Sequence, residues 1–95
     1  MKTFGTQGAV CGKIQAKRTP KYSMVSQRWY VTFEVKPFKG SKIPVSISAP
    51  YELELGGIPL TGTEVKIVGE MSATPHGGRL NSIRLVSTPD KITVQ

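Results

Sequence analysis

Apolar and polar residues alternate with a period of two along most of the chain. The clearest case is "WYVTFEV", in which Trp29, Val31, Phe33 and Val35 fall on one side of an extended strand and the residues between them fall on the other. Similar alternation recurs in other segments rich in Val, Ile and Thr, which turn-forming residues separate at nearly even intervals. This pattern predicts an all-β domain.

The alternating segments predict five strands. The first covers about residues 6–17, with Val10, Ile14 and Ala16 on one side, and Gly8 and Gly12 indicate bends of the kind that a closing barrel needs. The next four strands are about residues 28–36, 43–48, 64–71 and 79–87. Pro44 suits an edge or a bulge better than a central strand. Residues 88–95 form either a short sixth strand or a tail.

The connections between these segments indicate the architecture. A long polar connection follows the first strand, a wide interval separates the third strand from the fourth, and residues 72–78 form a hairpin loop. Tyr51 to Leu55, in the wide interval, makes either one helical turn or an extended excursion. This order of intervals predicts a five-stranded OB-fold barrel of Greek-key type, although an SH3-like barrel or a small sandwich also has short strands. At 95 residues the chain is a single domain, residues 1–95.

Positive charge is concentrated in one part of the chain. The formal net charge is +7, from 13 basic and 6 acidic residues, and between Lys13 and Lys42 only Glu34 opposes the cations. Such a local excess attracts phosphate backbones, although it is also compatible with a merely soluble basic face. The candidate phosphate contacts are Lys13, Lys17, Arg18, Lys21, Arg28, Lys36, Lys39, Lys42 and, in the second hairpin, Arg79.

Aromatic residues are interleaved with these cations. Sequence-tolerant binding of a single strand needs cations for the phosphates and flat rings on which bases stack. Tyr30 faces away from the predicted core, so it either stacks on a base or covers a neighbouring strand. Tyr22 and Phe38 lie beside lysines in the connections and are expected to stack. Trp29 shares the side of the core residues but lies at the end of its strand, so both core packing and stacking are open to it.

The residues of catalytic and metal sites are scarce. His76, Cys11 and Asp90 are each the only residue of their type, so a Ser-His-Asp or Cys-His arrangement and a tetrahedral zinc site lack parts. We expect no enzymatic activity, no cofactor, no metal and no small-molecule substrate. A lone cysteine and the absence of a long apolar segment lead us to expect no membrane partner and a location in the cytoplasm.

Several segments resemble OB-fold single-stranded-DNA-binding proteins. "AVCGKIQ" and "WYVTFEV" resemble the first two strands of the bacterial proteins of this kind and of primosomal replication protein N. "LTGTEVKIVGEMSA" is similar to their fourth strand, and "GGRLNSIRLVSTP" resembles their fifth strand and the end of filamentous-phage single-strand-binding proteins. The short segment 51–57 favours the primosomal or phage type. The resemblance implies an OB-fold and single-stranded DNA as the ligand. It also implies that the cell is bacterial or virus-infected.

The residues and the resemblance together predict a non-enzymatic single-stranded-DNA-binding protein that acts in DNA replication, recombination or transfer. Because one OB module covers about 4 to 16 nucleotides, we expect a homodimer or higher homo-oligomer. The alternatives are a protein-interaction module of a replication or conjugation assembly and an RNA-binding OB-fold protein.

Overall fold

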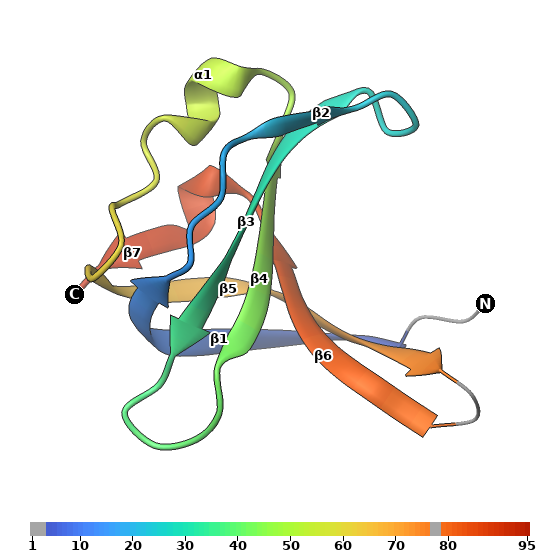
Figure 1. Ribbon diagram of the computed structural model, residues 1–95, viewed down its shortest axis with the longest axis vertical. Helices are drawn as coiled ribbons and strands as arrows, with labels where there is room; N and C mark the ends of the chain where they lie inside the picture. Colours follow the sequence, from blue (N-terminus) through green and yellow to red (C-terminus); the bar gives the residue numbers. More distant parts are fainter. Residues whose placement is uncertain (1–3, 77–78) are drawn as a thin grey trace.

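Long, alternating strands close into a barrel in the computed structural model, which describes residues 4–76 and 79–95 (Figure 1). The strands are β1 (Phe4–Gln15), β2 (Lys21–Ser23), β3 (Arg28–Lys36), β4 (Ile43–Ala49), β5 (Glu64–His76), β6 (Arg79–Ser87) and β7 (Ile92–Val94). One helical turn, α1 (Glu52–Leu55), and a 3₁₀ turn, η1 (Pro89–Lys91), complete the described elements. Neither helical segment is long and apolar enough to cross a lipid bilayer.

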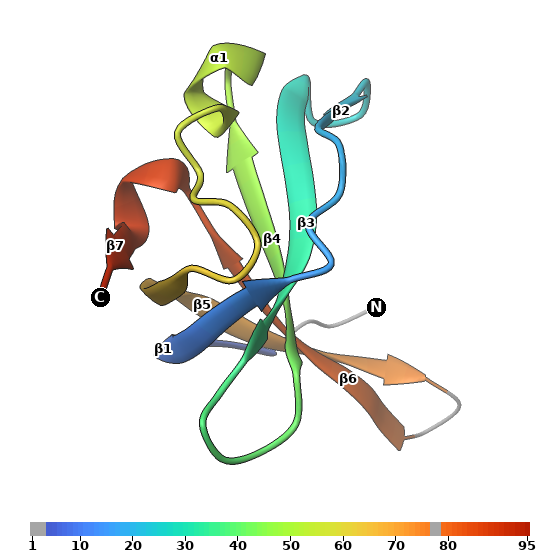
Figure 2. The ribbon, with the colours of Figure 1, turned by 60° about the vertical axis from the view of Figure 1, so that its left-hand side comes forward.

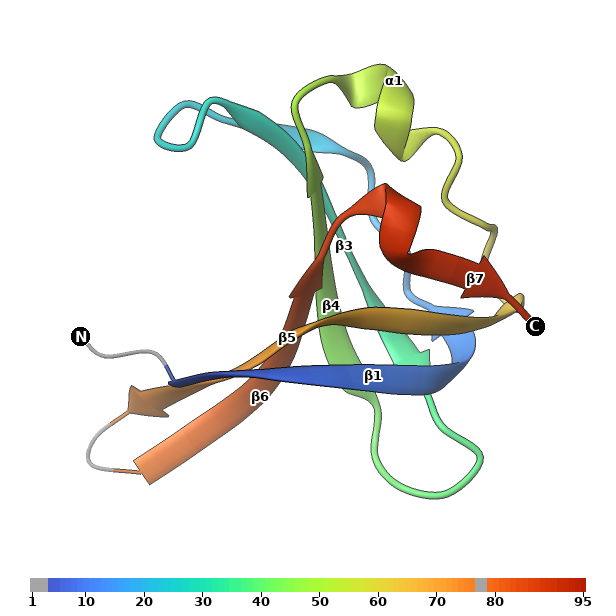
Figure 3. The same cartoon turned by 180° about the vertical axis from the view of Figure 1, so that it is seen from behind.

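The strand order defines the fold. The pairing runs β1-β3-β4-β6-β5 and returns to β1, because β1 pairs with both β3 and β5. Strands β4 and β6 are parallel, and the other pairs are antiparallel. Strand β2 extends the sheet beside β3. Strand β7 pairs with β5, as the view from behind in Figure 3 shows. This closed five-stranded barrel confirms the predicted OB-fold.

Barrel closure depends on the bend of β1. Its residues Phe4–Lys13 pair with β5, and its last three residues pair with β3. At the changeover, a Cβ atom on Gly12 would collide with the carbonyl oxygen of Lys36, so a side chain cannot fit there. The strand ends at Gln15 because Ala16 takes a left-handed φ of 54°. The prediction that the strand reaches residue 17 with Ala16 facing the core is therefore wrong, and Ala16 is exposed.

Apart from Ala16, the side chains that the alternation placed on the core side lie in the barrel interior or pack against it. The buried residues come from every strand of the barrel and from the connection that contains α1: Val10, Ile14, Val31, Phe33, Val35, Val45, Ile47, Ala49, Leu55, Ile58, Val65, Ile67 and Leu85. In Figure 2, α1 and the segment that follows it lie across one end of the barrel. The open choice for Tyr51 to Leu55 is settled as a helical turn that buries Leu55.

Two prolines lie where the sheet tolerates a missing N–H. Pro44 is in β4, but the β4–β6 ladder covers only Val45 to Ile47, so Pro44 lies beyond it. Pro75 lies at the register shift between β5 and β6. These two strands continue to the pair His76–Arg79, so residues 72–76, predicted as part of a loop, belong to β5. Residues 92–94 form the short strand β7, which settles the last open alternative.

Candidate nucleic-acid interface

The outer surface of β3 and β4 is a polar sheet face over the barrel core. Pairing across the two strands places Tyr30 opposite Ser48, Thr32 opposite Ser46 and Glu34 opposite Pro44. These side chains alternate with the buried residues and are half-buried. In this order of strands β3 and β4 are the second and third of the barrel, whose face takes oligonucleotides or oligosaccharides in OB-folds. We call this surface, with the flanking residues described below, the β3–β4 face.

Strand β2 brings a cation beside an aromatic ring on this face. Lys21 pairs directly with Tyr30, and Ser23 pairs with Arg28. Directly opposite residues of an antiparallel pair share a face with their Cβ atoms about 5 Å apart. The exposed Lys21 therefore lies next to the half-buried ring of Tyr30, which is the combination that holds a phosphate and its base.

Two arginines border the middle of the face. A hollow of about 140 Å³ is lined by Arg18, Thr32, Glu34, Pro44 and Arg84, among others. A second, more open hollow of about 510 Å³ follows the segment from Ala16 to Lys21. The backbone N–H of Arg18 donates to the carbonyl of Thr32 at 3.0 Å, which fixes this segment against β3. Glu34 lines the first hollow with the two arginines, so its negative charge offsets part of their positive charge.

Arg84 belongs to the face and is not among the predicted phosphate contacts. It precedes Leu85, which is fully buried, so the alternation in "SIRLVS" already placed Arg84 outside the barrel. Its position beside β4 follows from the parallel pairing of β4 with β6, which starts at Val45–Leu85. Local sequence patterns carry no information on such a pairing.

Some of the predicted phosphate contacts also form hydrogen bonds within the fold. The Lys17 Nζ donates to the carbonyl of Ile58 at 3.1 Å, and the Arg28 Nη2 donates to the carbonyl of Ser48 at 3.3 Å. The Lys36 Nζ donates to the carbonyls of Gly40 at 2.7 Å and Pro37 at 3.3 Å. An ammonium has three donors and a guanidinium five, so each group keeps donors for a ligand.

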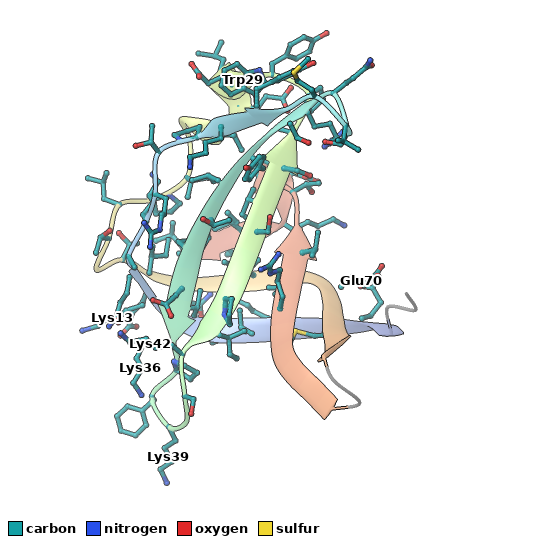
Figure 4. All side chains as sticks on the ribbon, turned by 45° about the vertical axis from the view of Figure 1, so that its right-hand side comes forward. Lys13, Trp29, Lys36, Lys39, Lys42 and Glu70 are labelled. Atoms are coloured by element: carbon teal, nitrogen blue, oxygen red, sulfur yellow. The ribbon has the colours of Figure 1, made fainter. Side chains whose placement is uncertain are left out.

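A second basic cluster lies at the other end of β3. Lys13, Lys36, Lys39 and Lys42 gather around the loop between β3 and β4, whereas Trp29 lies at the opposite end of the molecule (Figure 4). Trp29 and Lys36 are seven residues apart in β3, roughly 23 Å at the usual strand rise. Phe38 is 96% exposed in this loop and lines a cleft of about 590 Å³ with Cys11, Lys13 and Lys36. The predicted site residues thus form two groups, one on the β3–β4 face and one around the loop between β3 and β4.

Trp29 lies on the core side of the sheet. It packs against the buried cluster, opposite Ala49. Its ring meets that of Tyr22 edge to face, with centroids 5.5 Å apart, while Tyr22 is 48% exposed. Trp29 therefore packs against the core, and a stacking role for it stays a prediction.

Arg79, predicted as a phosphate contact in the second hairpin, has a side chain outside those that the structure describes.

Acidic groups border the face near Arg28. A hollow of about 470 Å³ is lined by Arg28, Ser48, Glu54, Thr88 and Asp90, among others. A hydrogen bond from the Thr88 hydroxyl lowers the pKa of Asp90 below its ordinary value, with smaller contributions from its own backbone N–H and Lys91. Asp90 is therefore ionised at neutral pH and limits the positive field on this side.

Comparisons with known protein families, curated proteins and solved structures found no match. An OB-fold barrel alone does not define a ligand, because the same fold carries many functions. Within residues 4–76 and 79–95, no three side chains of metal-ligand type gather into a site. The function must therefore be argued from the β3–β4 face itself.

Proposed function

We propose that this protein binds single-stranded DNA along the β3–β4 face, with little dependence on sequence. The pairing of Lys21 with Tyr30 carries the proposal, because it sets a cation beside a flat ring on the face that OB-folds use for oligonucleotides. Arg18 and Arg84 flank the same face and supply two further phosphate contacts. On this proposal the protein is not an enzyme, and it acts in the replication, recombination or transfer of DNA.

The shape of the face supports an extended strand as the ligand. Two open hollows share Ala16 and Arg18 in their lining, and they reach Arg84 on one side and Lys21 on the other. Bases stacked on Tyr30 leave their edges free, so binding tolerates any sequence. The hydroxyls of Ser46 and Ser48 line β4 opposite Thr32 and Tyr30 and are available to phosphate or sugar oxygens.

A fluorescence titration with oligo(dT) of increasing length tests this function. We expect quenching of tyrosine emission at low salt, and the length at which the signal saturates gives the occluded site and the stoichiometry of any oligomer. Tyr30→Ala should weaken binding by about 1–3 kcal/mol, whereas Tyr51→Ala, which removes a tyrosine 69% exposed outside this face, should leave affinity unchanged. No binding by the unmodified protein at low salt would reject the proposal.

The preference for DNA over RNA rests on the family resemblance. Matched oligo(dT) and oligo(U) in direct competition measure it. We expect DNA to bind more tightly by at least several-fold, and equal affinity would assign the face to RNA and DNA alike.

A further inference from the structure

The turn between β2 and β3 presents two apolar side chains to solvent. Met24 is 83% exposed and Val25 is 98% exposed. Hairpin turns normally take Gly, Asn, Asp or Ser, whose backbone preferences and side-chain hydrogen bonds favour the turn. In Figure 1 this turn projects beyond the barrel at the end of the β2–β3 hairpin. The fold therefore gains no core packing from either residue.

The hairpin that carries this tip is braced on both of its faces. On the core side, Tyr22 packs edge to face on Trp29, which itself packs on the buried cluster. On the outer side, the Arg28 guanidinium donates to the carbonyl of Ser48 in β4. The tip is consequently held at a defined position relative to the β3–β4 face.

Cations lie directly behind the apolar tip. Lys21 and Arg28 are on the hairpin itself, and the sequence from Lys13 to Phe33 contains no acid. A positively charged hairpin with an apolar tip is complementary to a polyanion that exposes flat apolar surfaces. Nucleic acid has this chemistry wherever a base pair is open at one end.

We propose that the tip of the β2–β3 hairpin is a wedge that inserts Met24 and Val25 against the terminal base pair at a junction between single-stranded and double-stranded DNA. Inserted apolar side chains, Met among them, unstack base steps in other protein–DNA complexes. The proposal rests on the function above, since a strand on the β3–β4 face runs past Tyr30 and Arg28 toward the tip. The protein then recognises the junction itself as well as the tail.

The test uses a DNA stem with a single-stranded dT tail and 2-aminopurine in the base pair next to the tail, in each tail polarity. The unmodified protein should bind one of these substrates about tenfold more tightly than the tail alone, with a rise in 2-aminopurine emission. Met24→Ser with Val25→Ser should keep the affinity for the tail and lose both effects. Leu60→Ser with Val94→Ser removes other exposed apolar side chains and should keep both.

Three results would overturn the wedge alone. The first is a junction preference that survives in the Met24→Ser, Val25→Ser variant. The second is intact binding of the tail with no preference for either junction, which leaves the proposed function standing. The third is co-sedimentation with anionic phospholipid vesicles that this variant alone loses, which would assign the tip to a membrane surface. Failure to bind the tail at all would reject the wedge and the proposed function together.

Discussion

The rings of Tyr22 and Trp29 meet edge to face at the middle pair of the β2–β3 hairpin, with an interplanar angle of 62°. Each residue pairs with the other across the two strands, and Trp29 continues the contact to Ala49 and the core. This contact connects the hairpin outside the barrel to the barrel interior. The position of Lys21 beside Tyr30 depends on it, because Lys21 and Tyr22 are neighbours in β2.

Removal of one ring should loosen this connection. We expect Tyr22→Ala to lower the free energy of unfolding by about 1 kcal/mol, the usual value of an aromatic pair. The emission maximum of Trp29, the only tryptophan, should move to longer wavelength as its ring gains solvent. Tyr22→Phe keeps the ring and should match the unmodified protein in both measurements. A Tyr22→Ala variant with unchanged emission would mean that the pair does not form in solution.

Gly12 is required where β1 meets the end of β3. A methyl group at this position would meet the backbone of Lys36 and Pro37, next to the pairing of Lys13 with Lys36 that joins β1 to β3. Gly12→Ala should therefore cost about 3 kcal/mol in urea unfolding. Gly57→Ala adds the same methyl group where its nearest contact, the Glu54 carbonyl oxygen, is at 3.9 Å, and should change stability little. Equal stability of the two variants would contradict the close approach.

The only buried polar side chain among the residues with described burial is that of Ser87, which is 6% exposed. Its hydroxyl donates to the carbonyl of Val68 at 2.5 Å and so joins β6 to β5 inside the barrel. Ser87→Ala leaves that contact unmade and should lower the free energy of unfolding by about 1 kcal/mol, with an unchanged m-value. Ser41→Ala, in the exposed loop, serves as the control. A neutral Ser87→Ala variant would assign no stabilising role to the bond.

Asp90 should show a pH dependence that Thr88 controls. The Thr88 hydroxyl lowers the pKa of Asp90, so the stabilisation from this carboxylate is present above the unfolded-state pKa and is lost as pH falls through the lowered folded-state value. Thr88→Val should raise the pKa of Asp90 toward its ordinary value. Because Asp90 is the only aspartate, its carboxyl carbon can be followed by NMR through an acid titration. Identical titration curves for the two proteins would contradict the role of Thr88.

The sequence predicts the barrel well because alternation reports directly on which side chains are buried. The bounds of β3 agree with the prediction, since its alternation is unbroken and Pro37 ends it. The end of β1 was missed because Ala16 has a left-handed backbone conformation that alanine seldom adopts. Nothing in the local pattern indicates that conformation.

The site is predicted less completely because residues that are close in sequence can lie far apart when they are in one extended strand. Arg28 and Lys36 lie in one short basic stretch, yet they are the first and last residues of the extended strand β3. Arg84 is distant in sequence and reaches the face through the parallel pairing of β4 with β6. The alternation predicts on which side of the sheet a side chain lies. Which two strands are adjacent depends on how the barrel closes, and the alternation does not show that.

The salt dependence of oligo(dT) binding tests most directly whether the β3–β4 face holds the strand. Two triple variants make the comparison: Arg18→Ala, Lys21→Ala and Arg84→Ala on the face, and Lys13→Ala, Lys39→Ala and Lys42→Ala around the loop. Each phosphate contact contributes about 0.7 to the slope of log affinity against log salt for a single strand, so the face variant should lose about 2 from the slope. The loop variant should keep the slope of the unmodified protein. A slope lost in the loop variant and kept in the face variant would contradict the proposed site.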